Sequence, residues 1–119
     1  SVDTEALTMV LARASACARL SPGQSDLAYT VGLLSGVASV LGMGESELVE
    51  TTGVSASVRS ALVDRRGPVG SALRAVLAYE DDQPFLITDA GHAVYEVSRA
   101  YLAALSGAMV TAGSVLEPS

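Results

Sequence analysis

The feature that most constrains the fold is the uncharged stretch at residues 27–44, LAYTVGLLSGVASVLGMG, bounded by Asp26 and Glu45. Its Leu and Val residues alternate with Gly, Ala and Ser rather than with charges, and a helix of this composition needs neighbours on most sides. Gly32 and Gly36 stand one helical turn apart, so another backbone can approach that face closely, although each glycine costs a helix roughly 1 kcal/mol. The stretch therefore predicts a buried central helix with tightly packed neighbours.

The composition favours one small helical domain. The chain has 119 residues, of which 50% are hydrophobic but only 4% aromatic, so its core has to be built from Ala, Val and Leu. Such modest side chains suit closely spaced helices. Seven basic and 13 acidic residues give a net charge of −6, which repels nucleic-acid phosphates and anionic lipid. We therefore expect neither nucleic acid nor a membrane as a partner.

Two stretches, 27–44 and 100–116, approach the length of a membrane span without a charge. Both are diluted by Gly, Ser and Thr, and neither has flanking Lys/Arg asymmetry or an aromatic belt, so helices buried in protein are the preferred interpretation. The N-terminus carries Asp3 and Glu5 and no positive cluster, which argues against a signal peptide. The single cysteine, Cys17, lies on an apolar stripe and is expected to be a core thiol in a reducing cytoplasm. The missing initiator Met suggests an expressed fragment or a processed chain, and we expect a fragment of a larger multidomain protein.

Hydrophobic periodicity predicts an all-α fold, a compact bundle of five to six helices in a single domain over residues 1–119. The expected helices are 4–20, 25–44, 46–52, 55–65, 68–80 and a last long one capped by Thr88 or Asp89, followed by a frayed tail at 113–119. Three acidic residues, Glu80, Asp81 and Asp82, are expected in a solvated loop. The short apolar run 85–87 has no strand to pair with and is expected to pack on the core.

For two of these helices, the sequence also predicts which side chains face the core or the solvent. In the first, Arg13 and Arg19 are expected to face water, because the apolar stripe runs along the residues Leu7, Val10, Leu11, Ala14, Cys17 and Ala18. In the last, the residues expected to face inward are Val94, Val97, Tyr101, Leu102, Leu105 and Met109.

The sequence offers little catalytic chemistry. A His-rich metal centre would need several ligands, and the chain has one histidine, His92. A carboxylate site for a hard cation could be formed only by residues such as 80–82, which are more often simply solvated. Arg65 and Arg66 could form an interaction surface for a phosphate or an acidic partner, although two solvated charges ending a helix are the commoner outcome. We predict no catalytic residue, no metal ligand and no cofactor.

Several motifs resemble the C-terminal half of HDOD domains, especially those fused behind EAL domains in bacterial signalling proteins. The matching segments are Tyr29-Thr-Val-Gly-Leu-Leu-Ser35, Leu41-Gly42-Met43, Ala61-Leu62, Gly67-Pro68-Val69-Gly70, Leu73, Ala78-Tyr79-Glu80 and, in the first helix, Arg13-Ala14 with Cys17. Here Ala18 replaces the acid that the family has after that cysteine, and the likeness is weak after Pro84. HDOD domains are similar to HD-type metal phosphohydrolases but lack the metal ligands, and Ser35-Gly36 occupy the place of the His-Asp pair.

The resemblance implies an HD-like helical fold and a non-catalytic regulatory or protein-interaction module of bacterial signal transduction, with cyclic di-GMP pathways as one context. The absent N-terminal half would cover apolar surface, so we expect an exposed apolar face that binds a neighbouring domain or a homodimer partner. Two alternatives remain open. One is a degenerate metal-dependent phosphohydrolase that uses Asp81 and Asp82, and the other is a small-ligand sensor with a pocket beside Gly32 and Gly36.

Overall fold

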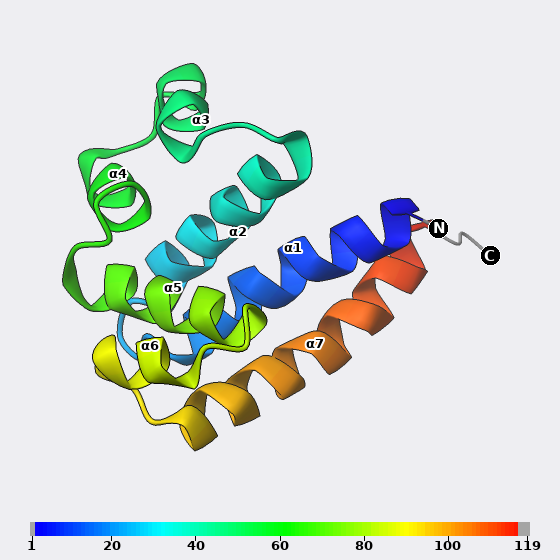
Figure 1. The fold of residues 1–119 in the computed structure, drawn as a ribbon. Coiled ribbons are helices and arrows are strands. Elements are labelled where there is room, and N and C mark those ends of the chain that lie inside the picture. The colour runs from blue at the N-terminus through cyan, green and yellow to red at the C-terminus, as the bar shows by residue number, and fades with distance from the viewer. Residues whose placement is uncertain (1, 117–119) are drawn as a thin grey trace.

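A computed structural model describes residues 2–116, which form seven helices and no strand (Figure 1). The all-α prediction is confirmed. One helix more than the predicted six is present, because residues expected to form a loop are helical. The helices are α1 (Val2–Arg19), α2 (Ser25–Leu41), α3 (Glu45–Thr52), α4 (Ala56–Leu62), α5 (Gly67–Glu80), α6 (Pro84–Asp89) and α7 (Val94–Leu116).

The two glycines of α2 lie against the backbone of α1. A Cβ atom on Gly32 would lie 2.8 Å from both the Cα of Ala14 and the carbonyl oxygen of Arg13, and one on Gly36 would lie 2.9 Å from the Cα of Val10. The predicted close approach is therefore confirmed. The same geometry brings the α1 backbone into the space beside the two glycines, where a ligand pocket was expected.

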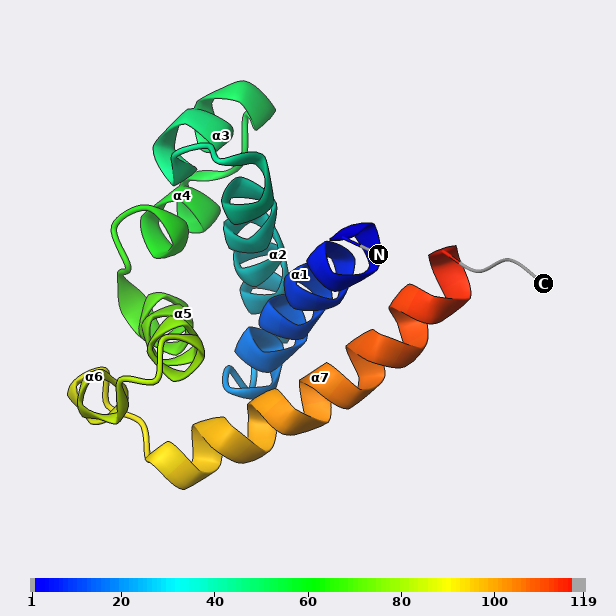
Figure 2. The same ribbon diagram turned by 45° about the vertical axis from the view of Figure 1, so that its right-hand side comes forward.

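On its other side α1 packs against α7, so that α1 lies between α2 and α7 (Figure 2). The contact face of α7 is a stripe of buried alanines, Ala104, Ala108 and Ala112. Their small side chains let the two helices approach closely, and Val97 is buried as well. The larger residues Val94, Leu102 and Met109, predicted to face inward, are 39%, 55% and 61% exposed. That part of the prediction was wrong because alanines, and not the largest apolar side chains, form the contact.

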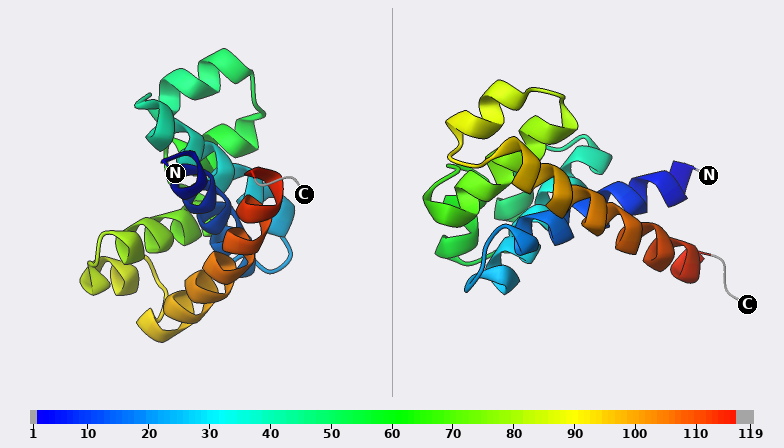
Figure 3. Two further views of the ribbon diagram at one scale, coloured as in Figure 1. Left: turned by 90° about the vertical axis from the view of Figure 1, so that its right-hand side faces the viewer. Right: turned by 90° about the horizontal axis from the view of Figure 1, so that it is seen from below.

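The remaining core lies where α4 and α5 pack against α2, and α5 also contacts α1 and α7 (Figure 3). Its largest fully buried side chains include Leu62, Leu73 and Val76. Helix α2 also contacts α1 and α3, in keeping with its predicted central place. Its surface residues Val40 and Leu41 nevertheless face solvent, so the centre of the bundle is the α1–α2 pair.

The run at residues 85–87 is part of α6, which begins with Pro84 in its first turn. Proline is well tolerated there because the first helical N–H groups have no partner within the helix. Ile87 is buried but Phe85 is 85% exposed, so only part of the run packs on the core. The last helix begins at Val94, later than the predicted cap at Thr88 or Asp89, and it continues through residues 113–116, where a frayed tail was predicted. The rest of that predicted tail, 117–119, lies outside the described residues.

No single helix within residues 2–116 has the length and the apolar character needed to cross a membrane. Helices α2 and α3 satisfy that test only when taken together, and they are bent by 112° relative to each other.

The glycine contact leads to a matched pair of substitutions. Gly32→Ala should lower the free energy of unfolding by about 1–3 kcal/mol, because the new methyl group forces α1 and α2 apart. Gly107→Ala in α7 should raise it by about 0.5–1 kcal/mol, because a Cβ there meets no atom within 4 Å and alanine favours the helix. Urea denaturation measures both values, and equal effects of the two substitutions would contradict the close contact.

Candidate functional site

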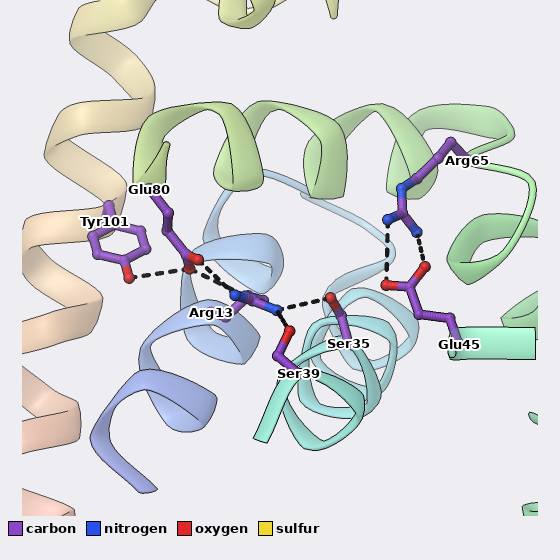
Figure 4. A network of polar contacts seen from close by, with 7 residues as sticks. All are labelled: Arg13, Ser35, Ser39, Glu45, Arg65, Glu80 and Tyr101. Carbon is purple, nitrogen blue, oxygen red and sulfur yellow. Dashed lines mark hydrogen bonds and ion pairs between the residues drawn. The ribbon is translucent and has the colours of Figure 1, made fainter. Parts of the chain in front are cut away.

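A buried polar cluster joins four helices at the centre of the molecule (Figure 4). Arg13 of α1 is only 6% exposed, and its guanidinium binds the carboxylate of Glu80 at the end of α5. Nε donates to Oε2 at 3.1 Å and Nη2 donates to Oε1 at 2.6 Å. This two-pronged geometry matches the planar guanidinium to the carboxylate and makes the pair stronger than a single contact would be.

Three hydroxyl groups complete the cluster. Arg13 Nη1 donates to the Oγ atoms of Ser35 and Ser39, each at 3.0 Å, and Tyr101 of α7 donates its hydroxyl proton to Glu80 Oε2 at 3.1 Å. The two serines lie one turn apart on α2, so both face the same guanidinium. The Tyr101 ring also lies against Tyr79, with ring centroids 5.0 Å apart. The cluster therefore ties α1, α2, α5 and α7 together.

The electrostatics of the cluster follow from its burial. Two ions removed from water lose hydration, and their attraction compensates only when the geometry is good and the remaining polar atoms are satisfied. Both oxygens of Glu80 and all three nitrogens of the Arg13 guanidinium have partners here. Burial raises the pKa of Tyr101, and the neighbouring Glu80 carboxylate adds to that rise, so the phenol stays protonated and remains a donor.

Sequence reasoning missed this cluster, since it placed Arg13 in water and Glu80 in a loop. Arg13 is interior because α1 is covered on two sides, and the small residues around it, Ala12, Ala14 and Ala16, are all fully buried. The sequence did contain a signal: alanines surround Arg13 on every face of its helix, which indicates a helix that is covered on more than one side. Glu80 belongs to the last turn of α5, where an acid opposes the helix dipole, and the Arg13 charge offsets that cost.

The two arginines predicted to form an interaction surface have different surroundings. Arg65 forms an ion pair with Glu45, with Nη1 at 2.9 Å from Oε1 and Nη2 donating to Oε2 at 3.2 Å, and it also donates to the Leu62 carbonyl (Figure 4). Arg66 is exposed, and its side chain has no partner within residues 2–116. Arg65 therefore holds the loop before α5 in place, whereas the side chain of Arg66 is available to bind another molecule.

The residues considered for a metal do not converge. Within the described part of the chain, no three His, Cys, Asp or Glu side chains are grouped so that they could hold an ion. Glu80 is bound to Arg13, whereas Asp81 and Asp82 are exposed. His92 precedes α7 and pairs with Glu96, its Nδ1 lying 3.3 Å from Oε1.

Cys17 is completely buried in the core, as predicted. Burial raises the pKa of its thiol from the ordinary 9.0 to about 12, although the nearby Arg13 charge opposes part of that rise. A thiol with this pKa carries almost no thiolate at neutral pH, so Cys17 behaves as a small apolar side chain.

A scan against models of protein families and searches of curated proteins and of solved structures found no match. The likeness to HDOD domains therefore rests on the sequence motifs alone. Three of the segments that carry it meet in the cluster, because Arg13-Ala14, Ser35 and Tyr79-Glu80 come from α1, α2 and α5 and contact one another through Arg13.

Neutralising one member of the buried pair should be costly. Glu80→Gln preserves the shape of the side chain but leaves the Arg13 charge buried and unpaired, so the free energy of unfolding should fall by about 3 kcal/mol. The control is Asp89→Asn, which removes the acid of the exposed Arg74–Asp89 pair and should cost less than about 1 kcal/mol. Chemical denaturation of both variants measures the difference, and a Glu80→Gln cost as small as the control would contradict the importance of the cluster.

Proposed function

We propose that this chain is a non-catalytic regulatory module that works through protein contacts in bacterial signal transduction, with cyclic di-GMP pathways as one context. The HDOD resemblance supports the proposal, because it implies a domain whose metal ligands have been lost. The hydrogen bonding of the polar groups at the centre of the molecule supports the proposal as well. Ser35, at the place of the lost His-Asp pair, accepts a hydrogen bond from Arg13 and so contributes to holding the fold together.

The observation that carries the proposal is an exposed apolar surface, which we call the α7 flank. It consists of Leu102, Leu105 and Met109 of α7 together with Met9 of α1. Leu102 and Met109 are 55% and 61% exposed, and Leu105 and Met9 are half-buried. Spacings of three, four and seven residues place the three α7 side chains on one side of the helix.

A groove of about 430 Å³ runs beside this flank, between the first half of α1 and the second half of α7. Its lining is mainly apolar, with Met9, Tyr101, Leu105 and Met109 as the largest residues. These halves of the two helices extend together away from α5 and α6 (Figure 3). A contiguous apolar surface bordered by polar residues is typical of a protein-binding site. The partner expected from the resemblance is a neighbouring domain or a second copy of this chain.

Self-association on the α7 flank is directly testable. In sedimentation experiments over a range of concentrations, the chain should form dimers, and Met109→Glu should weaken the dimer at least tenfold by placing a charge in the contact. Val110→Glu is the matched control, because Val110 is 72% exposed but lies about 100° further around α7. A chain that stays monomeric, or a Met109→Glu variant that dimerises like the control, would contradict docking of a second copy here.

The competing enzyme hypothesis makes the opposite prediction in a hydrolysis assay. With Mn²⁺ or Mg²⁺ and a generic phosphodiester, the purified chain should show no turnover above buffer, and an Asp81→Asn/Asp82→Asn variant should be indistinguishable from it. The physical reason is that both carboxylates are exposed and the adjacent Glu80 is occupied by Arg13. Measurable hydrolysis that the double substitution abolishes would overturn the non-catalytic proposal.

A further inference from the structure

A shallow pocket of about 460 Å³ lies where the start of α2, helix α4 and the start of α5 meet. Its lining combines a few apolar side chains with several hydrogen-bond donors. The donor side chains are Gln24, just before α2, Ser57 and Ser60 of α4, and Arg66, just before α5. No residue of α1 or α7 lines it, so it is separate from the α7 flank.

These four donor side chains are free to bind a ligand. None of them has a hydrogen-bond or ion-pair partner within residues 2–116. Arg65 shows the contrast, because its guanidinium is already bound by Glu45 and by the Leu62 carbonyl. A guanidinium, two hydroxyls and an amide group from three separate segments therefore line one pocket, with no partner within residues 2–116.

The electrostatics of the pocket also favour an anion. The chain as a whole carries a net charge of −6, yet none of the carboxylates within residues 2–116 lines this pocket. The N-terminus of α5, a 14-residue helix, borders it, and its N-cap residue Arg66 makes no side-chain cap hydrogen bond. The backbone N–H groups of Gly67 and Val69 in the first turn thus add positive potential beside the Arg66 guanidinium.

We propose that this pocket binds the phosphate group of a small molecule, with Arg66 as its principal ligand. Phosphate offers tetrahedrally arranged acceptor oxygens, which suits several donors approaching from different sides. Arginine matches it with two parallel N–H···O bonds. The serine hydroxyls and the Gln24 amide supply further donors. The pocket volume lies within the range of small-molecule sites. Such a site would make α4 and α5 responsive to a phosphorylated metabolite, independently of contacts on α7.

The test is a titration of the ¹⁵N-labelled chain, followed by the amide signals of Ser60, Gly67 and Val69. Inorganic phosphate and phenyl phosphate are the probes, and acetate is the comparison anion. We expect saturable shifts at these amides with both phosphates and at least tenfold weaker binding of acetate. Tighter binding of phenyl phosphate than of inorganic phosphate would identify a phosphomonoester as the preferred form, and the reverse order would identify the free ion.

The matched variants are Arg66→Gln and Arg59→Gln. Arg59 is an exposed arginine of α4 that does not line the pocket, so its loss changes the net charge equally. We expect Arg66→Gln to weaken phosphate binding about tenfold or more, as befits loss of a charge-assisted hydrogen bond, and Arg59→Gln to change it less than twofold. Absence of saturable shifts, equal effects of the two variants, or acetate binding as tight as phosphate would each overturn the proposal. Because both arginines are exposed and neither side chain has a partner in the described part of the chain, either variant should remain folded.

Discussion

The close approach of α1 and α2 is the constraint on which the rest of the structure depends. Gly32 and Gly36 have no side chains, so the α1 backbone packs directly on α2. No room is left for a Cβ atom at either position. The small buried residues Ala104, Ala108 and Ala112 let α7 pack on the opposite side of α1. A chain with few aromatic residues cannot fill wide gaps between helices, and it reaches a dense core by bringing the helices themselves together.

This packing explains why an arginine is buried. Once α2 and α7 cover α1, the side chain of Arg13 has no path to water and must find its partners inside. Glu80, Ser35, Ser39 and Tyr101 supply them from three other helices. Replacement of such a group by apolar residues need not destabilise a protein, so stability alone does not explain its presence. The cluster does favour one register of four helices. A shift of α1 or α5 would break the ion pair, and a shift of α2 or α7 would remove hydrogen bonds to it.

Most of the fold could be predicted from the sequence, whereas most of the candidate site could not. Helix positions follow from periodicity and from local signals such as Gly42 and Gly53, each of which ends its helix in the left-handed conformation. The environment of Arg13 depends on which helices cover α1, and that is a long-range property. The exposure of Leu102 and Met109 was missed for a related reason. Periodicity identifies an apolar side of a helix, but here alanines form the contact and the larger residues lie beside it.

The groups that hold the fold together therefore lie at its centre, whereas the groups that can bind other molecules lie at its surface. At the centre, every polar group of the Arg13 cluster is satisfied by another part of the chain, and the thiol of Cys17 is enclosed and protonated. At the surface, the α7 flank exposes large apolar side chains, and the donor side chains of the pocket beside Arg66 have no partner within residues 2–116. Because Arg65 fixes the loop before α5 through Glu45, Arg66 is displayed at a defined position next to the α5 N-terminus. A ligand bound there would be held by α4 and α5, which pack on α2, and α2 in turn contacts α1 along its length. An influence on α7 has two routes, the tightly packed α1–α2 pair and the direct contact of α5 with α7 through Glu80 and Tyr101.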